Sequence, residues 1–484
     1  MSTAALVFSS RFSAFARGFW YLTAVFGVAI ITLMGFMLLG ATLVSWSGFI
    51  FGIASALFML LLCMAPALGG VATLSNKNAF FSANLVIWAF LMSSEGIFFH
   101  FVTTQSTEAG HFDPSSVLEA LSWIVCFLAL ALVTAFRPGY LRKLFRGRLK
   151  WASIFGVIAV LSCPLSPNIP YSLALAFKLC VVVVTLFAVQ DGMDDMSAVK
   201  RLSSAMLAGT LTIVTLGLIV PFTGNGPVFG STGRFGVMIG LSGTAGLLLL
   251  WSVLLFVWTK KPRFFVIAVF SLVPMMLAAG KGGIAASFIS LLAFFAFLKK
   301  PAQALVATLC FATVFTLAIA FTPFGSFMER YAESGNASTL TGRTALWTAV
   351  WPEIMKKPII GHGYRASRFA SAEVEGAFAE AGHIHNSYLE VLYNNGIVGL
   401  IPVLTMNIII VVNLARVVRR PGSQEIRCYA AGALALFVHL QTWGLTAPTF
   451  GSTADIRFMT FLVLVLLSEV LKSEAARTLS NGNA

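Results

Sequence analysis

Residues 383–400, HIHNSYLEVLYNNGIVGL, gather side chains that can move protons and bind anions. His383 and His385 have an ordinary pKa near neutrality, so either can accept a proton or donate to a phosphate oxygen. Glu390 adds a carboxylate. We expect residues 385–394 to form a short helix that ends at Asn395-Gly396, because glycine tolerates the left-handed conformation there. His385 would then share a face with leucines and point into protein or lipid, where it could serve as a base.

Two other interpretations of these histidines stay open. The His-x-His pattern invites a zinc site, and His362 and Glu380 are near in sequence. A zinc site needs a third and a fourth ligand, which the sequence does not identify, so we expect no metal and no cofactor. A structural histidine bonded to the backbone is the simplest alternative.

The chain that must position these residues is too apolar for a soluble protein. Of its 484 residues, 58% are hydrophobic and only 10% are charged, against roughly 25% charged in soluble domains. Apolar runs of about 20 residues recur along the sequence, as membrane-spanning helices require. We therefore predict an all-α polytopic membrane protein with about 12–14 spans, at 20–44, 48–68, 80–102, 117–136, 151–166, 171–190, 203–222, 235–258, 264–280, 282–298, 303–323, 396–415, 428–446 and 456–471.

The basic residues predict how these spans are oriented. With the N-terminus inside and the spans alternating, the inside segments hold 22 of the 32 lysines and arginines. This is the positive-inside pattern, which accounts for most of the net charge of +14 without nucleic-acid binding. Both termini are then expected in the cytoplasm. The chain divides into N-terminal spans (1–323), one large outer loop (324–395), and C-terminal spans with a cytoplasmic tail (396–484).

The large loop carries a second predicted helix, which begins near Arg343. Trp347 and Trp351 are four residues apart and so lie on one face, and Pro352 should kink or end the helix. That face suits a helix lying in the headgroup region of the bilayer. A plain packing role for the two tryptophans is the alternative.

The remaining basic residues are expected on or toward the outer side. Several cations that converge on one membrane face would form a site for an anion such as a pyrophosphate, because arginine matches phosphate oxygens bidentately and lysine adds a point charge. Ordinary salt bridges or snorkelling are the alternative for each residue. These cations are Lys178, Arg234, Lys281, Arg330, Arg343, Lys356, Lys357, Arg365, Arg368 and Arg457.

At this point the sequence resembles a known family. His385-Asn386, nine residues, Gly396, two residues and Gly399 fit the pattern H[NSQ]x9Gxx[GTY], which is similar to the signature of the O-antigen ligase and polysaccharide polymerase superfamily. The segments GRTALW (342–347) and KKPIIGHGY (357–364) are similar to the outer loop of the same family. The resemblance covers the large loop and the general layout of spans.

The resemblance implies a lipid-donor glycosyltransferase fold (GT-C-like) with one large periplasmic loop, in the bacterial inner membrane. It implies transfer of a glycan from an undecaprenyl-diphosphate-linked donor to a sugar acceptor, with inversion and without metal. Lys281 stands where the family often has arginine, so the bidentate fork is lost there. The implied site residues are His385, Arg343, His383 and Glu390 for catalysis, Arg234, Lys281 and Arg343 for the diphosphate, and Asn386, Tyr388, Gly396 and Gly399 for the motif.

Three acceptors compete within the family. A polymerase adds one lipid-linked chain to another, a ligase moves the chain to a lipid A core sugar, and a protein O-glycosyltransferase moves it to serine or threonine. The run GHGY…HIHNSYLEVLYNNGIVGL is somewhat more similar to exopolysaccharide polymerases, which favours a surface-polysaccharide polymerase. A transporter or flippase of lipid-linked sugars is the rival from another class, although internal repeats and midplane polar helices are not evident. Other polysaccharide assembly proteins are the further partners to consider.

Overall fold

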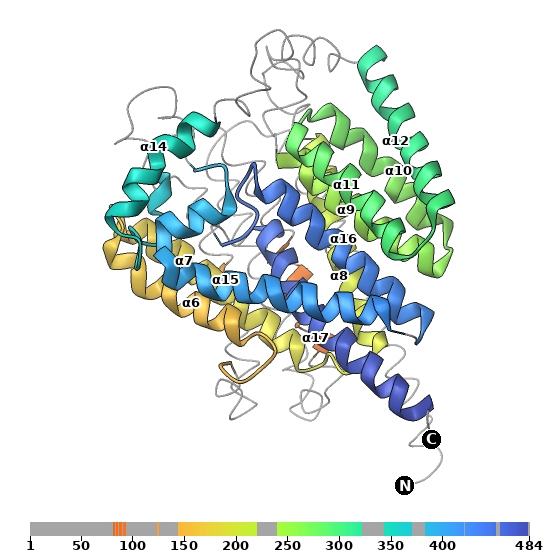
Figure 1. Ribbon diagram of the computed structural model, residues 1–484, viewed down its shortest axis with the longest axis horizontal. Helices are drawn as coiled ribbons and strands as arrows, with labels where there is room; N and C mark the ends of the chain where they lie inside the picture. The colour runs from red at the N-terminus through yellow and green to blue at the C-terminus, as the bar shows by residue number, and fades with distance from the viewer. Residues whose placement is uncertain are drawn as a thin grey trace, which may run out of the picture.

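The computed structural model describes residues 81–82, 84–85, 87–89, 91–92, 123–124, 144–219, 240–321, 343–369, 383–420, 422–451 and 455–482. Within these ranges the secondary structure is helical, without strands (Figure 1). The helices are α6 (Lys150–Ser162), η2 (Cys163–Leu165), α7 (Ile169–Gln190), α8 (Met196–Ile219), α9 (Gly240–Thr259), α10 (Pro262–Leu277), α11 (Lys281–Phe297), α12 (Pro301–Phe321), α14 (Arg343–Lys356), η4 (Ala366–Arg368), α15 (Ser387–Arg419), α16 (Gln424–Gly444) and α17 (Ile456–Gly482).

The helices follow the predicted spans from residue 151 onward. Five of them, α7, α8, α9, α12 and α15, are long and apolar enough to cross a membrane, and three shorter apolar helices lie at 150–165, 262–277 and 281–297. The all-α membrane class is thus confirmed for the described part of the chain. The expected spans 20–44 and 48–68 lie outside the described residues, and 80–102 and 117–136 lie mostly outside them.

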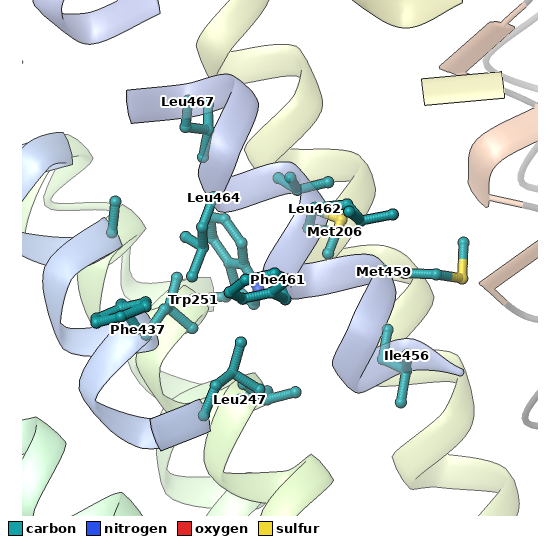
Figure 2. Close-up of a cluster of buried hydrophobic side chains, with 14 of the residues drawn as sticks. Met206, Leu247, Trp251, Phe437, Ile456, Met459, Phe461, Leu462, Leu464 and Leu467 are labelled. Carbon is teal, nitrogen blue, oxygen red and sulfur yellow. The ribbon is translucent and has the colours of Figure 1, made fainter. Parts of the chain in front are cut away.

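The centre of the bundle is an apolar core shared by α8, α9, α16 and α17. Trp251 of α9 and Phe461 of α17 are fully buried there, beside Met206 of α8 and Phe437 of α16 (Figure 2). Small residues bring neighbouring helices close, as is usual in membranes where packing replaces the hydrophobic drive. A Cβ added to Gly283 of α11, for example, would lie 2.5 Å from the backbone nitrogen of Gly243 in α9.

The loops predicted to be inside gather at one end of the bundle. Lys200 pairs with Glu425 at 2.5 Å, and Arg148 donates to the carbonyl of Met193 at 2.9 Å. Arg477 of α17 donates to the carbonyl of Asp194 at 2.7 Å. These contacts join the first turns of α8 and α16, the α7–α8 turn and the last turns of α17, as the expected topology requires. Which membrane face this end occupies stays a prediction.

Helix α15 folds back on itself at Gly396. This residue has φ 60° and ψ −164°, which is outside the helical region. In a straight helix residues 19 positions apart would be about 28 Å apart, yet the Asn407 side chain donates to the Tyr388 hydroxyl at 3.1 Å. The two parts therefore form a V, with a first arm of residues 387–395 and a second arm of residues 397–419. The expected stop at Asn395-Gly396 is confirmed, and the first arm lies beside the second arm rather than extending it.

Candidate active site

The two histidines precede the first arm of α15 instead of lying on it. The helix begins at Ser387, and the Asn386 side-chain oxygen accepts from the backbone N–H groups of Tyr388 and Leu389 at 3.0 and 3.1 Å. Asn386 is therefore the N-cap. His385, just before it, has φ 57°. The expected helix from residue 385 is wrong at its start, because the Asn386 cap ends the helical conformation there and leaves His385 free to point elsewhere.

The histidine rings form a contacting pair. Their centroids are 4.0 Å apart and their planes are inclined by 66°. Burial lowers the pKa of His383 to about 4 and that of His385 to about 3, although a hydrogen bond to the Thr446 backbone opposes the shift for His385. Both rings are therefore neutral near pH 7 and each has a nitrogen that can accept a proton.

Four arginines act electrostatically on the histidine pair. After burial, the charge of Arg365 is the largest contribution that lowers the pKa of His383, and Arg457 and Arg368 contribute further. For His385 the corresponding neighbours are His383 and Arg343. Four of the ten expected outer cations, from three segments of the chain, thus act on one pair of neutral rings.

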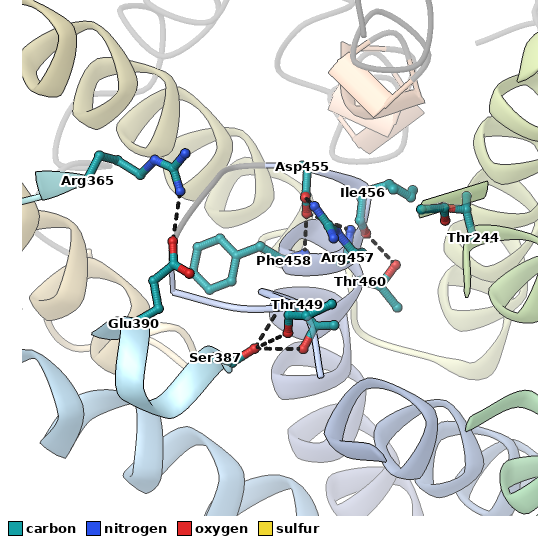
Figure 3. A network of polar contacts seen from close by, with 12 residues as sticks. Thr244, Arg365, Ser387, Glu390, Thr449, Asp455, Ile456, Arg457, Phe458 and Thr460 are labelled. Carbon is teal, nitrogen blue, oxygen red and sulfur yellow. Dashed lines mark hydrogen bonds and ion pairs between the residues drawn. The ribbon is translucent and has the colours of Figure 1, made fainter. Parts of the chain in front are cut away.

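Glu390 holds the backbone of the histidine segment through buried hydrogen bonds. Its carboxylate is fully buried and accepts from Arg365 at 3.0 Å (Figure 3). It also accepts from the Ser367 hydroxyl at 3.1 Å and from the backbone N–H of Ile384 at 3.3 Å. Ile384 is the residue between the two histidines. Glu390 therefore holds the backbone of the pair, and both of its oxygens already accept hydrogen bonds within the protein.

The break at Gly396 is bridged by the segment 358–363 of the large loop. Two N–H groups after the break donate to carbonyls of this segment, and two carbonyls before the break accept from its N–H groups. A Cβ on Gly396 would lie 2.2 Å from the Ile359 carbonyl oxygen, so only glycine fits. The four bonds are Ile397 N to Pro358 O (2.9 Å), Val398 N to Ile359 O (3.2 Å), His362 N to Tyr393 O (2.9 Å) and Gly363 N to Asn394 O (2.8 Å).

Gly399, the second motif glycine, supports the same turn. A Cβ there would lie 2.3 Å from the Asn395 Cβ. The Asn395 amide donates to the Ser162 hydroxyl at the end of α6 at 2.8 Å, which ties the V to a neighbouring helix. The glycines of the motif thus shape the support of the site and carry no chemistry themselves.

The loop between α16 and α17 completes the surroundings of His385. The Ser387 hydroxyl donates to the Ala447 carbonyl at 3.1 Å and accepts from the Thr449 N–H at 2.8 Å (Figure 3). A Cβ on Gly282 would lie 2.5 Å from the Thr446 hydroxyl oxygen, so the first turn of α11, with Lys281, lies against this loop. Lys281 therefore lies at the end of α11 that faces this loop, while Arg234 lies outside the described residues.

Helix α14 packs on the same segment. Its buried residues Leu346, Val350 and Ile354 form a cluster with Ile384, and Trp347 donates from its indole nitrogen to the Ile384 carbonyl at 3.0 Å. Both backbone groups of Ile384 are therefore held, its N–H by Glu390 and its C=O by Trp347. Pro352 does not end the helix, which continues to Lys356. Trp347 has the packing role, whereas Trp351 is 48% exposed.

Arg457 and the Arg365–Glu390 pair are parts of the site whose arrangement the sequence does not reveal. The Arg457 guanidinium is ion-paired with Asp455 through two nitrogens, one at 2.6 Å, and lies 5.3 Å from the Trp443 ring centre. Its proximity to Asp455 in sequence was the only signal. Arg365 and Glu390 are 25 residues apart, a spacing that indicates no contact.

The described residues contain no group of three histidine, cysteine or carboxylate side chains placed to hold a metal ion. His362 is engaged elsewhere, since its ring stacks on Tyr393 at 4.5 Å and its Nε2 lies 2.9 Å from the Glu353 carbonyl oxygen.

The comparison with known families agrees with this geometry. A family model described as O-antigen ligase matches residues 266–404, about 29% of the chain (139 of 484 residues). The matched region runs from α10 into the second arm of α15. It includes Lys281, Arg343, the histidine pair and both motif glycines. No curated protein matches the chain.

Proposed function

We propose that this chain, whose residues 266–404 match a family model described as O-antigen ligase, is a membrane glycosyltransferase. It would move a glycan from an undecaprenyl-diphosphate-linked donor to a sugar hydroxyl on the periplasmic side, with inversion and without metal. The observation that carries the proposal is the contacting pair of half-buried, neutral histidines on which several arginines act electrostatically. Such a site offers a proton acceptor beside a receptor for a polyanion.

Arg343 and Lys281 would hold the leaving group, since Arg365 and Arg457 are already paired with Glu390 and Asp455. A diphosphate carries charge that grows as the glycosidic bond breaks, and fixed cations in a site that excludes water stabilise that charge strongly. Arg343 begins α14 and acts electrostatically on His385, so it would contact the diphosphate beside the base. Lys281 would add charge from the first turn of α11, and Arg234 is retained from the resemblance.

His385 would take the proton of the acceptor hydroxyl. The acceptor oxygen then bonds to the anomeric carbon from the face opposite the diphosphate, and the bond from that carbon to the phosphate oxygen breaks. The proton moves to His385 and undecaprenyl diphosphate leaves with the electron pair. A base with a pKa of about 3 is weak, but a bound diphosphate would offset the arginine charges and raise that pKa toward the working pH.

Glu390 and Arg365 would position the histidines rather than exchange protons. The buried carboxylate already accepts three hydrogen bonds, one of them from Ile384. We therefore place His383 and His385 at the reacting atoms and Glu390 one step behind them. His383, which contacts the His385 ring, would orient that ring or share its proton.

The acceptor that we favour is a second lipid-linked glycan, as in a surface-polysaccharide polymerase. The similarity of residues 361–400 to exopolysaccharide polymerases supports this choice. The second candidate is transfer to a lipid A core sugar, because the matching family model is described as O-antigen ligase.

The test is reconstitution with purified components. The protein is incubated with one lipid-linked repeat unit and the products are resolved by size. A ladder supports the polymerase, and product that forms only after lipid A core is added supports the ligase. No product with either would overturn transfer to a sugar acceptor, and a protein acceptor or transport of lipid-linked sugars would then take its place.

Two variants and a control test the site in the same assay. His385→Ala should abolish product, and Arg343→Ala should add roughly 3–4 kcal/mol to the barrier, as loss of one such electrostatic group does elsewhere. Arg419→Ala, which removes an exposed cation at the other end of α15, should leave turnover unchanged. Near-normal turnover of Arg343→Ala would show that Arg343 is not at the diphosphate.

A further inference from the structure

Helix α14 has an exposed apolar side that its contact with the histidine segment does not use. Trp351 and Met355 are each 48% exposed, and Ile359 and Ile360, just after the helix, are 63% and 52% exposed. Thr344 and Thr348 are exposed on the same side, since at about 100° per residue these four helical positions fall within about 60° of one another. We call Trp351, Met355, Ile359 and Ile360 the α14 patch.

The α14 patch is uncharged, but a charged side borders it. Glu353 and Lys356 pair at 2.8 Å on another side of the helix, and Lys357 is exposed at its end. An exposed helix surface divided into an aromatic and aliphatic side and a lysine-bearing side is typical of helices that lie in a membrane interface. Tryptophan favours that depth in particular, because its ring has an apolar body and a polar N–H.

The patch continues the lipid-facing surface of a membrane-crossing helix. The second arm of α15 exposes a stripe of large apolar residues along its length, including Ile397 (50%), Ile401 (51%) and Ile408 (62%). Ile359 lies directly against the top of this arm, since its carbonyl accepts from the Val398 N–H at 3.2 Å. The exposed residue Ile359 thus lies beside the start of the exposed stripe of the second arm.

We propose that the α14 patch is a membrane-contact surface that seats α14 in the outer leaflet of the bilayer, with Lys356 and Lys357 at the level of anionic headgroups. The partner is the lipid bilayer itself. Continuity with the α15 stripe favours lipid over a second copy of the chain, and the bordering lysines match the phosphates of the leaflet surface. This inference does not depend on the proposed reaction.

Two adjacent residues offer a matched test. Met355→Cys and Lys356→Cys are made separately in a chain whose six native cysteines are replaced by alanine, then spin-labelled and reconstituted in vesicles of phosphatidylethanolamine and phosphatidylglycerol. Accessibility to molecular oxygen, which concentrates in acyl chains, is compared with accessibility to a water-soluble nickel complex. The label at 355 should favour oxygen and contact nickel several-fold less than the label at 356.

Two outcomes would overturn the proposal. If the label at 355 meets nickel as readily as the label at 356, the patch faces water. If the label at 355 is shielded from both reagents, protein covers the patch, either from a second copy or from another segment of this chain.

A second measurement keeps the native cysteines. In vesicles that contain acyl-brominated phosphatidylcholine, Trp351→Phe should lower the quenched fraction of tryptophan emission, because a ring near the bromines has been removed. Trp347→Phe removes a ring that is packed against the histidine segment through its bond to the Ile384 carbonyl, and it should lower the quenched fraction less than Trp351→Phe does. Equal quenching in the wild type and in Trp351→Phe would contradict membrane contact.

Discussion

Replacement of Glu390 tests whether this carboxylate positions the histidines or acts as a base. Glu390→Ala leaves the Arg365 guanidinium buried, at 7% exposure, without its counter-charge. Loss of one partner of a buried ion pair costs about 3–5 kcal/mol. The N–H of Ile384 and the hydroxyl of Ser367 also lose their acceptor. We therefore expect the free energy of unfolding to fall by at least that amount.

The double variant Arg365→Met/Glu390→Leu separates charge from hydrogen bonding. It removes both charges and keeps similar volume, which in other proteins is often neutral or stabilising. We expect it to recover most of the loss and to remain within about 2 kcal/mol of the wild type, since two hydrogen-bond donors stay unpaired at about 1 kcal/mol each. Turnover should stay low, because Ile384 has lost its anchor.

Two assays measure these effects. Unfolding in mixed micelles, titrated with a denaturing detergent, gives the coupling between the two positions as a double-mutant cycle. The pH dependence of turnover in Glu390→Gln distinguishes positioning from proton transfer. If Glu390 only positions the histidines, the variant has a lower maximum rate and keeps the acidic limb of the pH profile. Loss of the limb would mean that Glu390 itself titrates in the reaction. A loss of less than about 1 kcal/mol in the free energy of unfolding of Glu390→Ala would refute the stabilising role of the Arg365–Glu390 pair.

Three further predictions follow from the supports of the site. Gly396→Ala should lower the free energy of unfolding by more than about 2 kcal/mol, because the new Cβ meets a carbonyl oxygen at 2.2 Å, whereas Gly156→Ala, with nothing within 4 Å, should be neutral or stabilising by up to about 1 kcal/mol. The free energy of unfolding should fall as the pH drops from about 6.5 toward 4 and 3. In this range the histidines of the unfolded chain bind protons, whereas His383 and His385 of the folded protein stay neutral because their pKa values are lower. The slope should approach 1.4 kcal/mol per pH unit for each ring, and replacing both by asparagine should reduce it by their share. Trp347→Phe keeps most of the packing and removes one hydrogen bond, so a loss of about 1 kcal/mol in thermal-unfolding experiments is expected; no loss would mean that the bond is not formed in solution.

The spans could be predicted because their signal is local. An apolar run of about 20 residues with basic ends specifies a membrane helix almost regardless of its neighbours. The described helices α6 to α12 and α15 to α17 follow the expected ranges to within a few residues, apart from the extension of α15, α8 and α17 beyond them. Helix α15 is the instructive case, because the stop at Gly396 is local while the bridging segment 358–363 is long-range.

The sequence indicated which residues could form the candidate site, but not how they are arranged. The motif and the outer cations indicated His383, His385 and Arg343 as residues of one site. The start of the helix was misplaced by two residues because the Asn386 cap outweighs the apolar periodicity that begins at His385. The ion pair between Arg365 and Glu390 joins residues that are 25 positions apart, and no periodicity in the sequence predicts such a contact.

The length of the first arm of α15 sets how far the histidines lie from the break at Gly396 and in which direction they lie around the axis of the arm. Nine residues, 387–395, separate the Asn386 cap from the break at Gly396, which corresponds to about 13.5 Å and two and a half turns. One inserted residue would advance the histidines by about 1.5 Å and swing them by about 100° around the axis of the arm, away from the arginines. Seven inserted residues would restore the direction but displace the pair by about 10 Å. The nine-residue interval thus fixes both the distance and the direction of the histidines relative to the break, and its length matters as much as the residues at its ends.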